Sequence, residues 1–281
     1  MKALIVLLIL CTISFHGIAQ GVDTAMWLAS TYFRQADSAS RQDLMWKYPL
    51  YGPMLLVDPN SRTTYANMPD SAGSFTFITD GLYKGTLPPE VMIANTSINW
   101  QGRLWAVMLW PLPVDMEDRL SLMLHESFHR IQHQLGFPAL SPTIDHLATT
   151  NGRIFFLLEL QALKAALAKP VDQRKKDLVN ALLFRKRRQE LFPSTFANER
   201  LLEMNEGLAE YTGMLPGRLP GSIRQHLYNE IDKADTRLSL IRSMAYITGP
   251  VYGYLLYEKS PVWTASVDSN SSFPALIKKY Y

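Results

Sequence analysis

The stretch Met116–Gly136, MEDRLSLMLHESFHRIQHQLG, decides how this chain folds and what it does. It contains the pattern H-E-x-x-H at residues 125–129, inside a run whose apolar residues recur at helical spacing. Positions i and i+4 of a helix lie one above the other on the same face. His125 and His129 can therefore hold one metal ion, with the carboxylate of Glu126 beside it.

A helical wheel divides this stretch into two faces. The apolar face, which we expect to pack against the core, consists of Leu120, Leu124, Phe128, Ile131 and Leu135. The opposite face carries His125, Glu126, His129 and His133. Leu122 lies among the histidines, so we expect both faces of the helix to be covered.

Length and composition indicate a folded protein that does not bind nucleic acid. The chain has 281 residues, enough for one large domain or two small ones. Its hydrophobic fraction of 47%, with 19% charged residues, is ordinary for a globular protein. A net charge of +3 is too weak to favour nucleic acid or an anionic membrane surface as a partner.

Residues 1–19 have the pattern of a secretory signal peptide. Lys2 precedes an apolar run, residues 3–13, and small residues before position 20 favour cleavage after Ala19. The run is short for a bilayer, so we expect a secreted or periplasmic product without stable membrane insertion; an uncleaved anchor is the alternative. The one cysteine, Cys11, lies inside this run, so the mature chain has no disulfide.

The rest of the sequence predicts an α+β fold, with a small, mostly antiparallel sheet followed by a helical half. Residues 20–114 predict a helix at 23–46 and strands at 54–57, 63–66, 75–79, 91–98 and 103–110. Residues 115–281 predict helices at 115–135, 151–168, 174–191, 195–214, 222–243, 247–259 and 274–281. The motif helix therefore lies at the junction of the two parts, which form one catalytic unit.

One metal ligand is still missing, because a catalytic zinc ion is usually held by three side chains and a water. His133 lies about 12 Å along the helix from His125, too far to share the ion. The segment 205–210, NEGLAE, offers a better candidate. Glu206 can bind the ion, and Glu210, one turn later, can accept a hydrogen bond from a ligand histidine.

Other interpretations of these positions stay open. Glu159 lies on the apolar side of its helix, and a buried carboxylate must bind either the metal or an arginine. Asp145 and His146 are two further candidates for the third ligand, or else loop and cap residues. The predicted helix 195–214 carries a stripe of glutamates, which is also the pattern of a solvated acidic face. The stripe consists of Glu199, Glu203, Glu206 and Glu210.

H-E-x-x-H followed on a later helix by N-E-x-x-x-E resembles the gluzincin group of zinc metallopeptidases, which includes thermolysin-like enzymes and related aminopeptidases. The resemblance implies a zincin-like fold with zinc bound by His125, His129 and Glu206. It also implies Glu126 as general base and Glu210 as the residue that holds a ligand histidine. It covers two helices, and the gap from His129 to Glu206 is longer than in those enzymes by two helical segments.

Hydrolysis of a peptide bond also needs a donor for the developing oxyanion. Residues 246–249, YITG, resemble the Tyr-x-x-Gly stretch that follows the glutamate helix in the aminopeptidase branch, which implies that Tyr246 is this donor. Alternatively, Tyr246 is a half-buried core tyrosine. Tyr252 and His226 are the other candidates for the donor.

The resemblance further implies that a substrate peptide pairs antiparallel with an edge strand beside the motif helix. We expect residues 103–110 to form this edge strand. Trp105 and Trp110 then either line a cleft or serve as core aromatics. The basic helix 174–190 is expected to be a solvated face without a binding function.

Together these patterns predict an exported zinc-dependent peptidase that acts on peptides or proteins. In this hypothesis Glu126 takes a proton from a zinc-activated water and passes it to the leaving amine. Two alternatives remain: a zincin-like binding module without catalysis, and a zinc hydrolase that acts on a non-peptide amide or ester.

Overall fold

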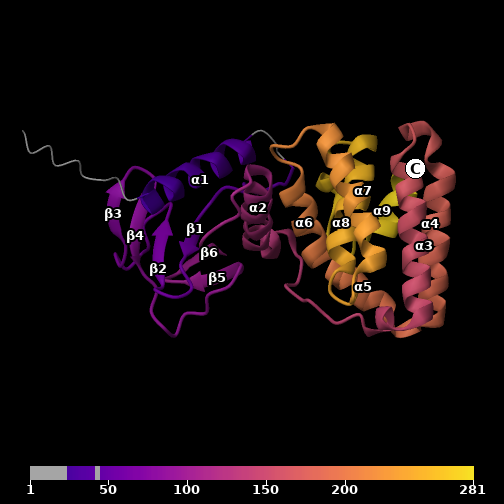
Figure 1. The fold of residues 1–281 in the computed structure, drawn as a ribbon, viewed down its shortest axis with the longest axis horizontal. Coiled ribbons are helices and arrows are strands. Elements are labelled where there is room, and N and C mark those ends of the chain that lie inside the picture. The colour runs from indigo at the N-terminus through magenta and orange to yellow at the C-terminus, as the bar shows by residue number, and fades with distance from the viewer. Residues whose placement is uncertain (1–23, 42–44) are drawn as a thin grey trace, which may run out of the picture.

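A six-stranded sheet forms one end of the molecule, and helices form the other end (Figure 1). This computed structural model describes residues 24–41 and 45–281; the expected signal segment lies outside them. The predicted α+β class is confirmed, since the sheet is mostly antiparallel and the C-terminal half is helical. Among the described residues, no helix combines the length and the apolar character needed to cross a membrane.

The sheet has the strand order β3-β4-β2-β1-β6-β5, in which β1 and β6 run parallel and the other neighbours antiparallel. Its strands are β1 (Met54–Val57), β2 (Thr63–Ala66), β3 (Thr76–Thr79), β4 (Leu82–Thr86), β5 (Thr96–Trp100) and β6 (Arg103–Leu109). β1 is a continuous apolar run because both of its faces are buried. Met54 and Leu56 face the main core, while Leu55 and Val57 face a smaller cluster on the other side.

Two strands differ from their predictions. The prediction misses β4, which pairs with β3 across the connection Asp80-Gly81. An Asp-Gly pair between strands is a hairpin signal, but all four residues of β3 are exposed and β4 buries only its first residue, so hydrophobic alternation is absent there. β5 begins at Thr96 rather than at residue 91.

The prediction that residues 103–110 form the edge strand is wrong. β6 lies between β1 and β5, and residues 105–108 are fully buried. The local pattern did not reveal that β1, far away in the sequence, pairs with the open side of the β5–β6 hairpin. β5 is therefore the edge strand beside α2, and β3 forms the opposite edge of the sheet. Trp105 is a core aromatic whose Nε1 donates to the carbonyl of Trp100, and Trp110 packs against Tyr32 and Tyr65.

α1 (Thr24–Arg41) and α2 (Met116–Gln132) pack on one face of the sheet, and α2 stands between the sheet and the other helices (Figure 1). Asp115 caps α2 as predicted, because its side chain accepts a hydrogen bond from the backbone N–H of Asp118. Both faces of α2 are largely covered: His125 and Glu126 are buried, as are the apolar residues opposite them, and His129 is partly buried.

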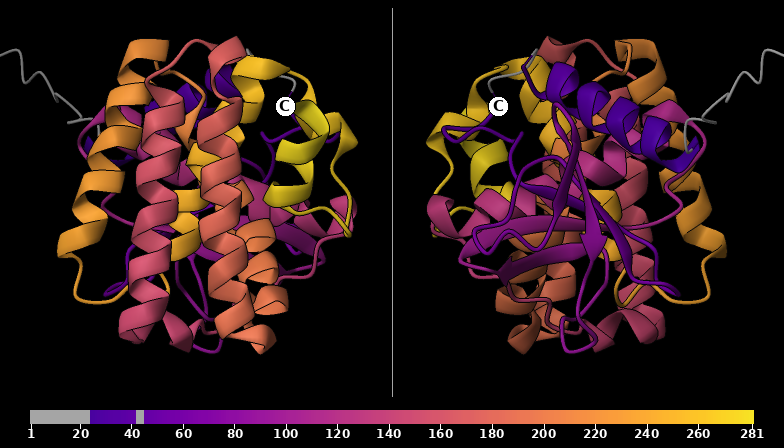
Figure 2. Two further views of the ribbon diagram at one scale, coloured as in Figure 1. Left: turned by 90° about the vertical axis from the view of Figure 1, so that its right-hand side faces the viewer. Right: turned by 90° about the vertical axis from the view of Figure 1, so that its left-hand side faces the viewer.

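The helical half forms successive layers behind α2, with α3 and α4 side by side at the end farthest from the sheet (Figure 1; Figure 2). Its helices are α3 (Thr150–Leu167), α4 (Lys175–Leu191), α5 (Phe196–Leu202), α6 (Leu208–Met214), α7 (Pro220–Thr236), α8 (Met244–Lys259) and α9 (Phe273–Tyr280). α6 packs against α2, and α8 packs against α6. α7 ends earlier than its prediction, and α8 begins earlier, so Tyr246 lies in the first turn of α8.

The predicted helix 195–214 is interrupted by one turn of π-helix, Glu203–Gly207, between α5 and α6. A π turn holds more residues than an α turn and changes which way the following side chains point. α8 comes very close to the chain here: a Cβ atom added at Gly249 would lie 2.3 Å from the Cα of Gly207. Glycine at both positions therefore permits direct backbone contact between α8 and the π turn.

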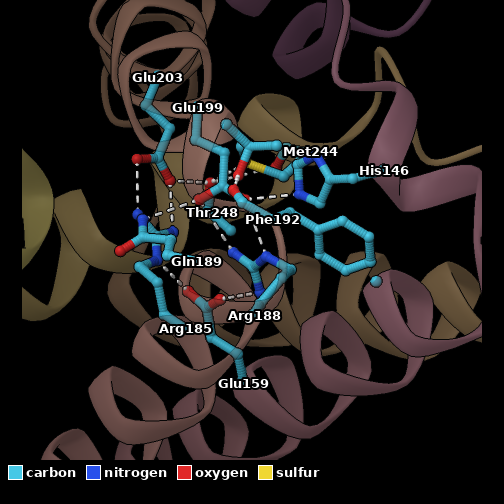
Figure 3. A network of polar contacts seen from close by, with 12 residues as sticks. His146, Glu159, Arg185, Arg188, Gln189, Phe192, Glu199, Glu203, Met244 and Thr248 are labelled. Atoms are coloured by element: carbon cyan, nitrogen blue, oxygen red, sulfur yellow. Dashed lines mark hydrogen bonds and ion pairs between the residues drawn. The ribbon is translucent and has the colours of Figure 1, made fainter.

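A network of buried charges joins the helices behind the π turn (Figure 3). Arg185 of α4 donates to Glu159 of α3 at 2.8 Å and to both carboxylate oxygens of Glu203 at 2.6 and 2.8 Å. Arg188 donates to Glu159 at 2.7 Å and to Glu199 at 2.8 Å. Each of these five side chains is at most 3% exposed. We call these five residues the buried network.

The buried network excludes one alternative interpretation and corrects one expectation. The glutamate stripe is not a solvated face, because Glu199 and Glu203 are fully buried. Burial opposes the ionised form of Glu199, but Arg188 and His146 outweigh it and hold the pKa of Glu199 well below its ordinary value. The basic helix 174–190 is not simply a solvated face either, because Arg185 and Arg188 point inward to carboxylates of other helices.

Candidate metal centre

The three predicted ligands converge between α2 and the π turn. Nε2 of His125 and Nε2 of His129 are 3.2 Å apart, and each lies 3.6 Å from Oε2 of Glu206. Ligand atoms about 2.1 Å from a zinc ion, at the corners of a tetrahedron, are about 3.4 Å apart. The spacing of these three atoms therefore fits a tetrahedral site with one corner left for water or substrate.

Each histidine is held through its other ring nitrogen. Nδ1 of His125 lies 2.9 Å from Oε2 of Glu210, and Nδ1 of His129 lies 2.8 Å from Oε1 of Gln132. The amide nitrogen of Gln132 donates to the carbonyl of Pro138, which fixes the orientation of that amide. Both oxygens facing the histidines accept, so both Nδ1 atoms carry the hydrogen. The Nε2 lone pairs are then directed at the point that Glu206 also faces.

The carboxylates make this point favourable for positive charge. Burial of His125 opposes its charged form, but the hydrogen bonds with Glu206 and Glu210 outweigh burial and raise the pKa of His125 to about 10. Burial likewise acts against ionised Glu206, yet His125 and His129 hold its pKa far below the ordinary value. The carboxylates that stabilise a proton on His125 would also stabilise a metal ion beside it, so this set of side chains suits a cation.

Sequence reasoning missed the residues that support Glu206. Ser141 Oγ and Asn205 Nδ2 donate to Oε1 of Glu206 at 2.8 and 3.0 Å. Asn205 in turn accepts from Gln132 at 2.7 Å, which completes a chain of hydrogen bonds from His129 to Glu206. Gln132 lies three residues after His129, and residues at this spacing on a helix are neighbours, so their contact could have been predicted from sequence. Ser141 lies in a loop and has no such signal.

Glu126 lies beside the ligands but is not one of the three converging residues. Its side chain is buried, and its Oε2 has no hydrogen-bond partner within residues 24–41 and 45–281. Burial raises the pKa of Glu126 against the opposing effect of His125 and His129. Glu126 also lines a cavity of about 430 Å³ together with His125. A buried carboxylate oxygen without a partner at a cavity is available to a bound reactant.

Of the three candidate oxyanion donors, Tyr246 lies nearest the ligands. Its hydroxyl donates to Oε2 of Glu206 at 2.6 Å, and its ring stacks on His125 at 5.9 Å. Burial and the charge of Glu206 raise the pKa of Tyr246, so the hydroxyl keeps its proton. His226 lines the same cavity. Tyr252 is fully buried and donates to Glu159, away from the ligands.

The structure does not bring the rival third ligands to the site. Glu159 is bound by the two arginines of the buried network, as the structural alternative predicts. Nε2 of His146 lies 2.8 Å from Glu199, also in the helical half. Asp145 is exposed in a short turn beside it. Glu206 is the carboxylate that the fold places between the two histidines.

Removing the carboxylate that holds His125 should weaken metal binding. We expect Glu210→Ala to lower the affinity for zinc by about 10- to 100-fold, because His125 loses the group that fixes its tautomer. Competition with a chromophoric chelator measures this affinity. Glu190→Ala, which removes an exposed carboxylate of α4, is the matched control and should bind zinc like the unmodified protein. Equal affinity in both variants would contradict the role of Glu210.

The candidate metal centre therefore draws its side chains from α2, the π turn, α6 and α8. It brings together three potential ligand atoms, one buried carboxylate and one tyrosine hydroxyl. This arrangement can bind a divalent cation and activate a water beside it. Comparison of the chain with models of known families, with curated proteins and with solved structures found no match.

Proposed function

We propose that this protein is an exported zinc-dependent peptidase with a zincin-like catalytic part. The observation that carries the proposal is the separation of 3.2 to 3.6 Å among the ligand atoms of His125, His129 and Glu206. The unpartnered carboxylate oxygen of Glu126 beside them adds the base that hydrolysis requires. The gluzincin-like motifs and the signal-peptide pattern of residues 1–19 support the chemistry and the export respectively.

The residues around the metal position have separate roles in the proposed hydrolysis. A zinc ion held by the three ligands would supply Lewis acidity to a water and to the scissile carbonyl. Glu126 takes a proton from the attacking water and then gives it to the leaving nitrogen, and its unpartnered oxygen beside the ligands suits both steps. Tyr246 donates a hydrogen bond to the carbonyl oxygen as negative charge develops there. Glu210 and Gln132 keep the histidine lone pairs in place.

The surroundings of the ligands favour an extended peptide over a small amide or ester. One cavity, of about 430 Å³, lies beside His125, and a second, of about 470 Å³, lies beside His129. The edge strand β5 passes the second cavity, and Asn95, directly before β5, lines the first. An exposed edge strand can pair with the backbone of an extended peptide. A substrate lying along β5 would therefore have residues on both sides of the metal position.

Metal analysis combined with a peptide-library assay tests the proposal. We expect about one zinc ion per chain, and hydrolysis that a chelator abolishes and added zinc restores. Zinc binding without hydrolysis of any peptide would contradict the proposal and favour a binding module. Hydrolysis confined to small amides or esters would favour the non-peptide hydrolase instead.

A further inference from the structure

We propose that Arg218 selects substrates with a free C-terminal carboxylate, so that the enzyme releases a dipeptide from the end of a peptide chain. This inference rests on the proposed function. In the reaction, water supplies a hydroxyl group to the new C-terminus of the shortened peptide. Its remaining proton goes to the amine of the released dipeptide.

Arg218 is a permanent cation in the proposed catalytic cavity. It lies on the connection between α6 and α7, and it lines the same cavity as His125, Glu126 and Tyr246. Its side chain is only 4% exposed. A guanidinium keeps its charge at every pH at which proteins are folded. The cavity that would receive one side of the substrate is also lined by the carboxylates of Asp118, Glu126 and Glu210, so a negatively charged group is favoured there only in direct contact with Arg218.

Among the described residues, the guanidinium nitrogens of Arg218 make only long contacts with carboxylates. Nη2 lies 3.4 Å from Oδ1 of Asp118, and Nε lies 3.5 Å from Oε2 of Glu117. Both distances exceed the roughly 2.8 Å of a good charge-assisted hydrogen bond, and Nε has no hydrogen-bond partner in that part of the chain. The two carboxylates are 66% and 39% exposed, so water weakens their attraction. A substrate carboxylate can accept two parallel hydrogen bonds from the planar guanidinium of Arg218, which is a better match than these long contacts.

The direction of β5 indicates which end of the substrate meets Arg218. The chain first passes Asn95, which lines the cavity of Arg218, and then Ser97 and Asn99, which line the cavity beside His129. A peptide that pairs antiparallel with β5, the slightly more stable pairing, runs the opposite way. Its C-terminal side then enters the cavity of Arg218, where a free carboxylate is the group that distinguishes a chain end.

The position of Arg218 along α2 sets the length of the released fragment. Its nearest partner, Asp118, precedes His125 by two turns of helix, which is about 10 Å along the axis. Two extended residues span about 7 Å, and a hydrogen bond adds about 3 Å. We therefore expect the carboxylate to lie two residues beyond the scissile bond.

One peptide prepared as the free acid and as the C-terminal amide provides the test. We expect the unmodified, zinc-loaded protein to cleave the acid with a kcat/KM on the order of 100-fold higher, and to release a dipeptide identified by mass spectrometry. Arg218→Met should reduce this preference to a few-fold, and Arg218→Lys should retain part of it. Arg187→Met, which removes an exposed arginine of α4, is the matched control and should keep the full preference.

The outcomes separate this inference from the proposed function. Equal cleavage of acid and amide by the unmodified protein would overturn the role of Arg218 and leave a zinc peptidase. If neither peptide is cleaved, the peptidase proposal falls, and binding to zinc-loaded Glu126→Gln, measured by calorimetry, decides the role of Arg218. Tighter binding of the acid by about 100-fold would support carboxylate recognition, and equal affinities would exclude it.

Discussion

Glu126→Gln is expected to remove nearly all hydrolysis while leaving bound zinc in place. Glutamine has almost the shape of glutamate but cannot take a proton from water, so kcat/KM should fall on the order of 1,000-fold. Zinc content should stay the same, since Glu126 is not among the three converging ligands. Measuring metal content and peptide hydrolysis on the same preparation separates loss of the base from loss of the ion.

Without bound metal, the same variant should be at least as stable at neutral pH as the metal-free unmodified protein. Burial raises the pKa of Glu126 in the folded state, so its ionised form costs free energy of folding there. The neutral amide removes this cost, and no internal hydrogen bond to Oε2 is lost within the described residues. Glu190→Gln, on the exposed face of α4, is the matched control and should keep full activity. Undiminished activity in Glu126→Gln would rule out Glu126 as the base.

Arg185→Met should have the largest effect on stability. The variant leaves Glu159 and Glu203 buried with too little positive charge, because Arg185 is the residue that binds both. Removal of one partner from a buried ion pair costs about 3–5 kcal/mol of the free energy of unfolding. Denaturant unfolding followed by circular dichroism measures this loss, and the fold should unfold at a clearly lower denaturant concentration.

A neighbouring arginine on the same helix supplies the control for this stability measurement. Arg187 is 56% exposed and pairs with Glu190 at 3.2 Å. Arg187→Met should change the free energy of unfolding by no more than about 0.5 kcal/mol, because exposed ion pairs contribute little. If Arg185→Met and Arg187→Met unfold at the same denaturant concentration, the buried network does not hold the helices together.

The ligand face of α2 could be predicted from sequence because it depends on one helix alone. The spacing of His125 and His129 determines where their side chains point once the segment is helical. Glu206 and Glu210 could also be predicted, because they lie one helical turn apart in the segment 205–210. The contact of Glu210 with His125 is present in the structure as expected. Whether these residues bind zinc and hydrolyse peptides stays a prediction.

The errors concern relations between distant segments. β6 is an interior strand because β1 pairs with it, and nothing within residues 103–110 indicates this partner. Arg185 and Arg188 looked solvated because the carboxylates that bind them come from α3, α5 and the π turn. A wheel at 100° per residue also placed four glutamates on one face, since it does not allow for a π turn.

The π turn gives the helical segment 196–214 two separate tasks. Within it, Glu203 faces inward to Arg185 and Thr248, whereas Glu206 faces the histidines of α2. An uninterrupted α-helix would turn these two carboxylates toward nearly the same direction. The π turn thus directs Glu203 to the buried network and Glu206 to the candidate metal centre. If this segment were one residue shorter, Glu203 could not reach Arg185 while Glu206 faces the histidines. The length of the segment is therefore as important to the site as its side chains.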